Sequence, residues 1–149
     1  MKIVLGSDHG GLALKEEIKK HLEQKGIEYD DIGCFTSEAV DYPDIGQAVG
    51  EAVVAGKYEK GIIFCGTGIG ISISANKVPG VRAALCGDCF SAKVSREHND
   101  ANVLALGERV IGVELAKMIV DIWLSSEFLG GRHGRRVDKI KAIEEKYNR

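Results

Sequence analysis

The sequence predicts an α/β protein in which helices cover both faces of a parallel β-sheet. Short, nearly continuous apolar runs such as Ile62-Ile63-Phe64-Cys65 are typical of strands that are buried on both faces. Segments with apolar residues at helical spacing alternate with these runs along the chain. The 19 glycines fall at the ends of the apolar runs, where they mark turns. We therefore expect a three-layer α/β/α, Rossmann-like fold in a single domain that spans residues 1–149.

Five apolar runs are expected to form a five-stranded parallel sheet. They are Lys2–Gly6, Glu28–Ile32, Gly61–Cys65, Arg82–Leu85 and Val103–Leu106. After the first run, Leu14, Ile18 and Leu22 recur at four-residue spacing and predict a helix. Gly26 is placed to end that helix.

Further helices are expected between the later strands and at the C-terminal end. Asp44 is a suitable N-cap for the second helix, whose apolar stripe includes Ile45 and Val53. The remaining helices are expected after Gly70, from about Asp88 to Arg96, over about Val113–Leu124, and over about 135–147.

Composition gives no reason to expect nucleic acid or a membrane as a partner. The formal net charge is -2, and 44% apolar with 28% charged residues is ordinary for a globular protein. No long apolar run follows a basic start, so neither a signal peptide nor a membrane span is expected. The four cysteines are then expected to stay reduced, and the protein to be cytoplasmic.

The end of the third expected strand carries the most distinctive segment, Cys65-Gly66-Thr67-Gly68-Ile69-Gly70. Its G-x-G-x-G spacing differs from the dinucleotide pattern G-x-G-x-x-G, and no Gly-Lys-Ser/Thr follows to make a P-loop. Unobstructed backbone N–H groups at a helix start favour an anion, either phosphate or an oxyanion that develops during a reaction. They also favour the thiolate form of Cys65. The alternative is a buried structural cysteine before a tight turn.

Polar side chains also follow the first expected strand, in the segment Gly6–Gly11. Ligands of parallel sheets collect beyond the carboxyl ends of the strands, which makes Asp8 and His9 candidate ligand-binding residues. The alternative is a helix N-cap beside a surface histidine.

The segment Ser95–Asn102, before the fifth strand, is too polar for a core and contains His98 and Asn99. His98 is either a functional group or a histidine that interacts with the dipole at a helix C-terminus.

Basic residues gather after the fifth strand. Arg109 follows that strand, and Arg132 and Arg136 belong to a basic run just before the last helix. Their guanidinium groups either bind phosphate or form a solvated face.

Cys86 and Cys89 have the C-x-x-C spacing of redox and zinc sites. A structural zinc site needs four ligands, and no second cysteine pair exists to complete one. The tryptophan-rich surroundings that are usual for thioredoxin-like motifs are also missing. We therefore expect this spacing to be coincidental.

Taken in order, the motifs resemble ribose-5-phosphate isomerase type B and its relatives that act on galactose 6-phosphate and allose 6-phosphate. The motifs that carry the resemblance are Gly6-x-Asp8-His9, Asp41-Tyr42-Pro43, Cys65-Gly66-Thr67-Gly68-Ile69-Gly70, Ala75-Asn76-Lys77, Arg96-x-His98-Asn99-Asp100-x-Asn102-Val103-Leu104 and Gly131-Arg132-His133-x-x-Arg136. Each motif alone is weak, but together they cover essentially the whole chain. Some relatives use a carboxylate as the base, so Cys65 places this sequence with the cysteine-type branch.

The resemblance implies interconversion of ribose 5-phosphate and ribulose 5-phosphate, a step of the pentose phosphate pathway, without a metal or an organic cofactor. It also implies a homodimer or homotetramer whose active sites combine residues of two subunits. The last helix, at about 135–147, is then expected to pack on a partner subunit.

The resemblance also implies roles for individual residues. Cys65 would be the base that moves a proton between carbons one and two of the open-chain sugar. Thr67 and His98 would assist opening of the furanose ring, with His98 as the acid/base group. The expected substrate contacts are Gly66, Gly68, Ile69 and Gly70 to the enediolate oxygen, Asp8 and Asn99 to sugar hydroxyls, and His9, Arg109, Arg132 and Arg136 to the phosphate.

Two other functions stay open on the sequence. One is a hexose-6-phosphate isomerase that acts on allose or galactose phosphates. The other is a phosphate-binding module in which the glycine segment holds a ligand without chemistry, although mere binding requires neither Cys65 nor His98.

Overall fold

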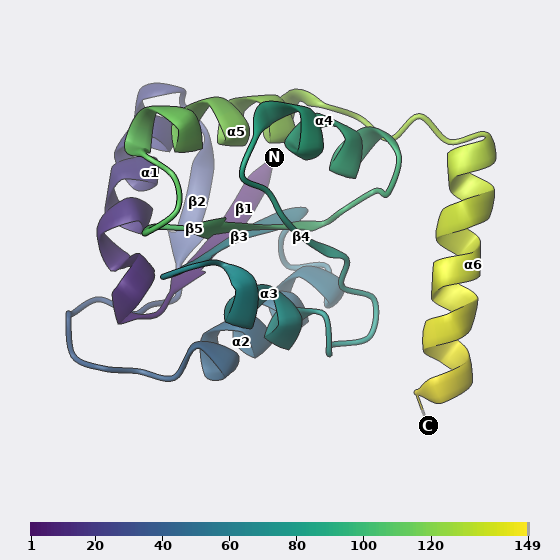
Figure 1. The fold of residues 1–149 in the computed structure, drawn as a ribbon, viewed down its shortest axis with the longest axis horizontal. Helices are drawn as coiled ribbons and strands as arrows, with labels where there is room; N and C mark the ends of the chain where they lie inside the picture. Colours follow the sequence, from purple (N-terminus) through teal and green to yellow (C-terminus); the bar gives the residue numbers. More distant parts are fainter. Residues whose placement is uncertain (149) are drawn as a thin grey trace.

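The computed structural model describes residues 1–148, which form one parallel sheet with helices on both faces (Figure 1). The strand order is β2-β1-β3-β5-β4, and every neighbouring pair is parallel. The strands are β1 Lys2–Ser7, β2 Glu28–Asp31, β3 Lys60–Cys65, β4 Ala83–Leu85 and β5 Val103–Gly107. The predicted Rossmann-like α/β fold with five parallel strands is confirmed, and each strand end lies within one residue of its expected place.

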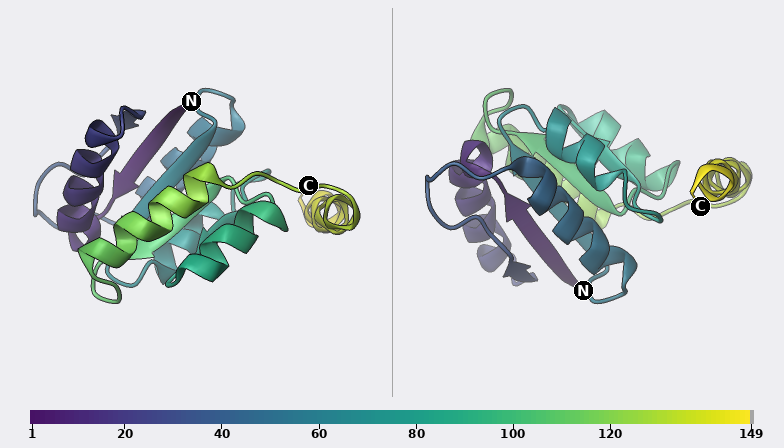
Figure 2. Two further views of the ribbon diagram at one scale, coloured as in Figure 1. Left: turned by 90° about the horizontal axis from the view of Figure 1, so that it is seen from above. Right: turned by 90° about the horizontal axis from the view of Figure 1, so that it is seen from below.

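Helices form the two outer layers. They are the short 3₁₀ helix η1 His9–Gly11, α1 Leu12–Gln24, α2 Tyr42–Val54, α3 Ile69–Ala75, α4 Cys89–Glu97, α5 Val113–Ser125 and α6 Arg132–Tyr147. Seen from above, α1, α4 and α5 cover one face of the sheet, and from below α2 and α3 cover the other (Figure 2). None of the helices within residues 1–148 is both long and apolar enough to cross a membrane.

The side chains of the central strand β3 alternate between two cores, because successive residues of a strand point to opposite faces. Ile62 and Phe64 pack with the helices of the α1/α4/α5 layer, while Ile63 and Cys65 pack with those of the α2/α3 layer. All four side chains are buried. This burial on both faces explains the continuous apolar run that predicted the strand, and it directs Cys65 toward the layer that contains α3.

Two expected helix starts were wrong. Asp44 does not cap α2: Asp41 occupies the N-cap position, and Asp44 lies inside the first turn. The Tyr42-Pro43 pair starts the helix earlier, since proline is well tolerated in a first turn, where its missing N–H has no helical partner. The last helix begins at Arg132, about one turn before the expected position. The expected end of α1 is confirmed, because Gly26 adopts the left-handed conformation with φ +71°.

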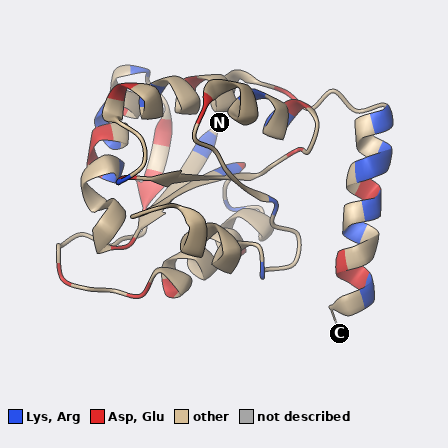
Figure 3. Ribbon diagram, viewed as in Figure 1, with Lys and Arg blue, Asp and Glu red and all other residues tan. Residues whose placement is uncertain are grey.

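Helix α6 lies beside the three layers and carries the C-terminal end of the chain away from the sheet (Figures 1 and 2). Its contacts with the body include a hydrogen bond from the Gly80 amide to Glu144 Oε1 at 2.9 Å and the buried side chain of Val137. Ile140 and Ile143 of this helix are 45% and 62% exposed. Basic residues gather at the start of the helix (Figure 3).

Candidate active site

The candidate site lies at the carboxyl edge of the sheet, where β1, β3 and β5 end side by side. The register pairs Ser7 with Phe64 and Cys65 with Gly107, so the segments after these three strands begin next to one another. They surround a hollow of about 460 Å³. Its lining consists of Asp8, Tyr42, Cys65, Gly66, Thr67, Ile69, Gly70, Ile73 and Arg109.

Cys65 stands at the end of β3 with its side chain 4% exposed. The Gly68 amide donates a hydrogen bond to the Cys65 Sγ, with 3.0 Å between nitrogen and sulfur. This geometry depends on glycine, because Gly68 has φ +78° and a Cβ there would lie 2.5 Å from the side chain of Leu85. An N–H group directed at the sulfur is the kind of donor that a thiolate accepts.

The loop after Cys65 is joined by backbone hydrogen bonds to the loop after β5. The Glu108 amide donates to the Cys65 carbonyl at 3.0 Å, and the Arg109 amide donates to the Gly66 carbonyl at 2.9 Å. A Cβ on Gly66 would lie 3.2 Å from Arg109 Nη1. Glycine at position 66 therefore leaves room for the Arg109 guanidinium directly over the loop.

Thr67 and Gly70 shape the start of α3. Thr67 Oγ1 accepts a hydrogen bond from the Ile69 amide at 3.2 Å, which holds the hydroxyl beside the first turn. The ring of Tyr42 lies against Gly70, where a Cβ would be 2.5 Å from the nearest ring carbon. Tyr42 and Ile73 were not among the predicted site residues. Tyr42 belongs to the motif Asp41-Tyr42-Pro43, and no motif contains Ile73. Both line the hollow.

Asp8 and His9 follow β1 beside the same hollow. Asp8 is 7% exposed and accepts a hydrogen bond from the Gly11 amide at 3.1 Å, so it does cap a short helix. It also lines the hollow, and the two roles are compatible because a carboxylate accepts several hydrogen bonds. His9 is exposed, and its Nδ1 lies 3.2 Å from the Val40 amide, which makes Nδ1 the acceptor.

The other predicted residues lie at the opposite edge of the sheet. Helix α4 starts after the carboxyl end of β4 and runs back, so His98 and Asn99 precede the amino end of β5. At that edge the Gly61 amide donates to the Asn102 carbonyl at 3.0 Å. From Gly61 to Cys65 the strand spans about 13 Å, at about 3.3 Å per residue. Within one chain, therefore, His98 and Asn99 are not brought to Cys65.

Arg132 and Arg136 lie near His98 and Asn99, because His133 lies between the two arginines in the first turns of α6 and contacts His98. These five residues form a second cluster. The rings of His98 and His133 stack with centroids 4.1 Å apart and planes 6° from parallel. Desolvation lowers the pKa of His133, and electrostatic interaction with His98, Arg132 and Arg136 lowers it further. The motif contained His133, but sequence reasoning gave it no role.

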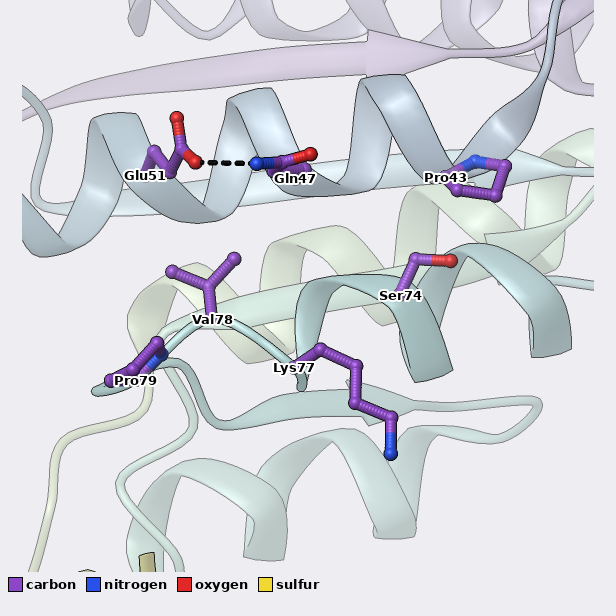
Figure 4. A pocket seen from close by; sticks show the side chains of 7 residues that line it. All are labelled: Pro43, Gln47, Glu51, Ser74, Lys77, Val78 and Pro79. Atoms are coloured by element: carbon purple, nitrogen blue, oxygen red, sulfur yellow. Dashed lines mark hydrogen bonds between the residues drawn. The ribbon is translucent and has the colours of Figure 1, made fainter. Parts of the chain in front are cut away.

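A second hollow, of about 440 Å³, lies between α2 and the segment that follows α3 (Figure 4). Its lining includes Gln47, which donates a hydrogen bond to Glu51 at 2.8 Å, and Lys77. None of the predicted site residues lines it, so it is not the candidate site.

The two cysteines of the C-x-x-C spacing differ in their exposure to solvent. Cys86 is 3% exposed, and burial raises the pKa of its thiol to about 11, although a hydrogen bond with Ser95 opposes that rise. Cys89 is partly exposed at the start of α4, and neither thiol forms a disulfide. No group of three or more metal-ligating side chains is found within residues 1–148.

We predict that Cys86 is unreactive toward alkylation between pH 7 and 9. A thiol whose pKa is raised to about 11 carries almost no thiolate in that range, and the thiolate is the reactive form. Timed iodoacetamide labelling of the native protein, read by peptide mass spectrometry, should show Cys89 modified well before Cys86. Equal labelling rates, or a disulfide between the two under mild oxidant, would contradict the prediction.

Comparisons with known proteins agree with the motifs. The Ribose/Galactose Isomerase family matches residues 3–140. Ribose-5-phosphate isomerase B of Escherichia coli is 53% identical over 99% of each chain. D-erythrulose-4-phosphate isomerase of Pectobacterium atrosepticum is 46% identical over 97% of this chain and 95% of its own. The solved structure of Clostridium thermocellum ribose-5-phosphate isomerase B superposes with a TM-score of 0.98 at 59% identity, covering 99% and 100% of the two chains. The chain therefore belongs to the Ribose/Galactose Isomerase family.

Proposed function

We propose that this protein is an aldose-ketose isomerase that interconverts ribose 5-phosphate and ribulose 5-phosphate. The observation that carries the proposal is the Gly68 amide directed at the sulfur of Cys65, a residue that lines the hollow at the carboxyl edge. A thiolate base beside backbone donors suits proton transfer next to a carbonyl. Membership of the family and the E. coli relative, which is named for this substrate, support the choice of ribose 5-phosphate.

In the proposed reaction, the Cys65 thiolate takes the proton from C2 of open-chain ribose 5-phosphate and forms an enediolate. The thiol then returns the proton to C1, while the hydroxyl proton moves from O2 to O1, which gives ribulose 5-phosphate. Amide donors of Gly66–Gly70, apart from the Gly68 N–H on the Cys65 sulfur and the Ile69 N–H on Thr67 Oγ1, stabilise the negative oxygen of the enediolate in this proposal. The reaction moves protons only, so we expect it to need neither a metal nor an organic cofactor.

We further propose that each active site combines two subunits of a homodimer or homotetramer. Cys65, Asp8, His9 and Arg109 belong to one edge of the sheet. The second cluster, formed by His98, Asn99, Arg132, His133 and Arg136, belongs to the other edge. In a two-fold symmetric dimer, a patch of one chain that contacts a different patch of the partner does so twice, once in each direction. The carboxyl edge of each chain can therefore meet the second cluster of the other chain, which gives two equivalent sites.

Exposed apolar side chains support this assembly. Ile69 and Ile73 on α3, with Leu85 at the end of β4, are each more than 40% exposed beside the hollow, and Phe90 on α4 is 73% exposed. Ile140 and Ile143 of α6 are exposed too, in keeping with a last helix that packs on a partner. Exposed apolar patches of this kind mark interaction sites. The four free cysteines support a reducing location, and we infer the cytoplasm.

The substrate prediction is that ribose 5-phosphate has the highest kcat/KM among four sugar phosphates. The other three are allose 6-phosphate, galactose 6-phosphate and erythrulose 4-phosphate, which represent the alternatives that the family offers. Initial rates with each compound decide the substrate, and a marked preference for a hexose phosphate would replace the proposal. Proton NMR in deuterated water separates catalysis from binding, since a binding module would incorporate no solvent deuterium into the sugar.

Replacing Cys65 with alanine is expected to reduce kcat by roughly 10² to 10⁴-fold, the range for loss of a general base. The matched control is Cys89→Ala, which removes a partly exposed thiol outside the hollow and should leave kcat near the wild-type value. Circular dichroism confirms that both variants fold. Near wild-type turnover in a folded Cys65→Ala protein would exclude Cys65 as the base.

The shared site predicts complementation between two impaired variants, Cys65→Ala and His98→Asn. A mixed dimer has one site with both the intact Cys65 of one chain and the intact His98 of the other. Purified through two different affinity tags, it should regain roughly half of the wild-type activity, because one of the two symmetric sites is complete. If the mixed dimer has only the average activity of the two parent variants, the sites are not shared in this way.

A further inference from the structure

Lys15 is a fully buried lysine that none of the expected roles uses. It lies on α1, and its side chain is 0% exposed. Its ammonium group donates to Asp31 Oδ1 at 2.8 Å and to the Cys34 carbonyl at 2.5 Å. A buried charge is costly unless it is paired and hydrogen-bonded, so this lysine is held where its partners are. Those partners are the end of β2 and the start of the loop that follows it.

Asp31 gathers several donors at this point. It accepts hydrogen bonds from the ammonium groups of Lys15 and Lys19 and from the Gly33 amide, and its side chain is 7% exposed. Burial alone would raise the pKa of Asp31, but these donors outweigh it and lower the pKa below the ordinary value of 3.8. The carboxylate is therefore charged at neutral pH and fixes both lysines.

The two lysines differ in the second group that each contacts besides Asp31. Lys19 is 20% exposed and also pairs with Glu16 on its own helix, whereas Lys15 reaches the Cys34 carbonyl. Cys34 and Gly33 in turn pair with the end of β1: the Ser7 amide donates to the Gly33 carbonyl, and the Cys34 amide donates to the Ser7 carbonyl, each at 2.7 Å. Lys15 thus holds the start of the β2–α2 loop (residues 32–41), at Cys34, directly beside the residues that precede His9.

The same loop touches His9 at its other end. Between Cys34 and Val40, residues 35–39 are all exposed. The Val40 amide then donates to His9 Nδ1 at 3.2 Å. An imidazole that accepts at Nδ1 carries its proton on Nε2 when it is neutral, so this contact selects one tautomer. The loop therefore connects a buried lysine to the protonation pattern of a histidine beside the candidate site.

We propose that Lys15 is a positioning residue: by holding the start of the β2–α2 loop, it places the Val40 amide on His9 Nδ1. His9 then keeps an N–H donor at Nε2 for the phosphate group of the substrate. The role of His9 toward a sugar phosphate rests on the proposed function. The link from Lys15 to the His9 tautomer does not, and it can be measured without substrate.

The test compares Lys15→Met with the matched control Lys19→Met, which removes the other lysine on Asp31 but no contact to the loop. Nitrogen-15 NMR of the imidazole rings distinguishes the two tautomers, and a His9→Gln spectrum identifies the signal among only four histidines. The wild type and Lys19→Met should show the Nε2–H tautomer of His9. Lys15→Met should show a mixture of both tautomers.

Kinetics supply the second measurement. Lys15→Met should raise the KM for ribose 5-phosphate roughly tenfold, as expected when a hydrogen bond to a charged group weakens, and leave kcat nearly unchanged. Lys19→Met should change neither constant. Val40→Pro removes the amide donor itself and should reproduce both effects of Lys15→Met.

Three outcomes would overturn the proposal. The first is a folded Lys15→Met protein in which His9 keeps the single Nε2–H tautomer. The second is an equal change in Lys19→Met, which would indicate a general loss of stability, and the third is a Val40→Pro variant with unaltered His9 and KM. If Lys15→Met does not fold, the double variant Lys15→Met/Asp31→Asn leaves no unpaired buried carboxylate and is judged by the same criteria, with Asp31→Asn alone as its control. Absence of isomerase activity in the wild type would instead overturn the proposed function and leave the tautomer result standing.

Discussion

The candidate site depends on how closely the turn between β3 and α3 packs against its neighbours. A Cβ on Gly11 would lie 2.5 Å from the Phe64 carbonyl carbon, and one on Gly68 would lie 3.0 Å from the Leu106 carbonyl carbon. Gly107 packs equally tightly against the backbone of Thr67. Side chains at these places would push the turn away from β1 and β5. The close contact fixes the Gly68 amide on the Cys65 sulfur, beside the hollow that Gly66, Thr67, Ile69 and Gly70 help to line.

Most of the fold could be predicted from the sequence because burial on both faces leaves a plain pattern. The run Ile62–Cys65 predicts a strand without reference to distant residues, and the Leu14/Ile18/Leu22 spacing predicts α1. Helix starts were harder to predict. Asp41 and Asp44 are both suitable caps by residue type. Pro43 favours the earlier start, because proline is tolerated in the first turn of a helix, and a prediction that weighs Asp44 alone therefore places the start too late.

The residue types of the candidate site could be proposed from the sequence, but their arrangement in space could not. The glycine segment and Cys65 were visible because a parallel sheet collects ligands at its carboxyl edge. His98 follows the end of α4, and the direction in which α4 runs places it at the opposite edge of the sheet from Cys65. Sequence motifs do not give the direction of a helix relative to the sheet. No sequence pattern marks Lys15, although it stands three residues before Ile18, on the buried side of the same helix. A lysine in an amphipathic helix is ordinarily read as solvent-facing, and only the structure reveals its acceptors.

Because the two residue clusters are separated by the length of one strand, the activity per chain should depend on protein concentration. If an active site forms only where two chains meet, a lone chain is folded but inactive. The rate per chain then falls on dilution below the dissociation constant of the dimer, although the fold of each subunit persists. In a cell, the rate of sugar-phosphate conversion would rise more steeply than in proportion to synthesis of the protein when its concentration is low.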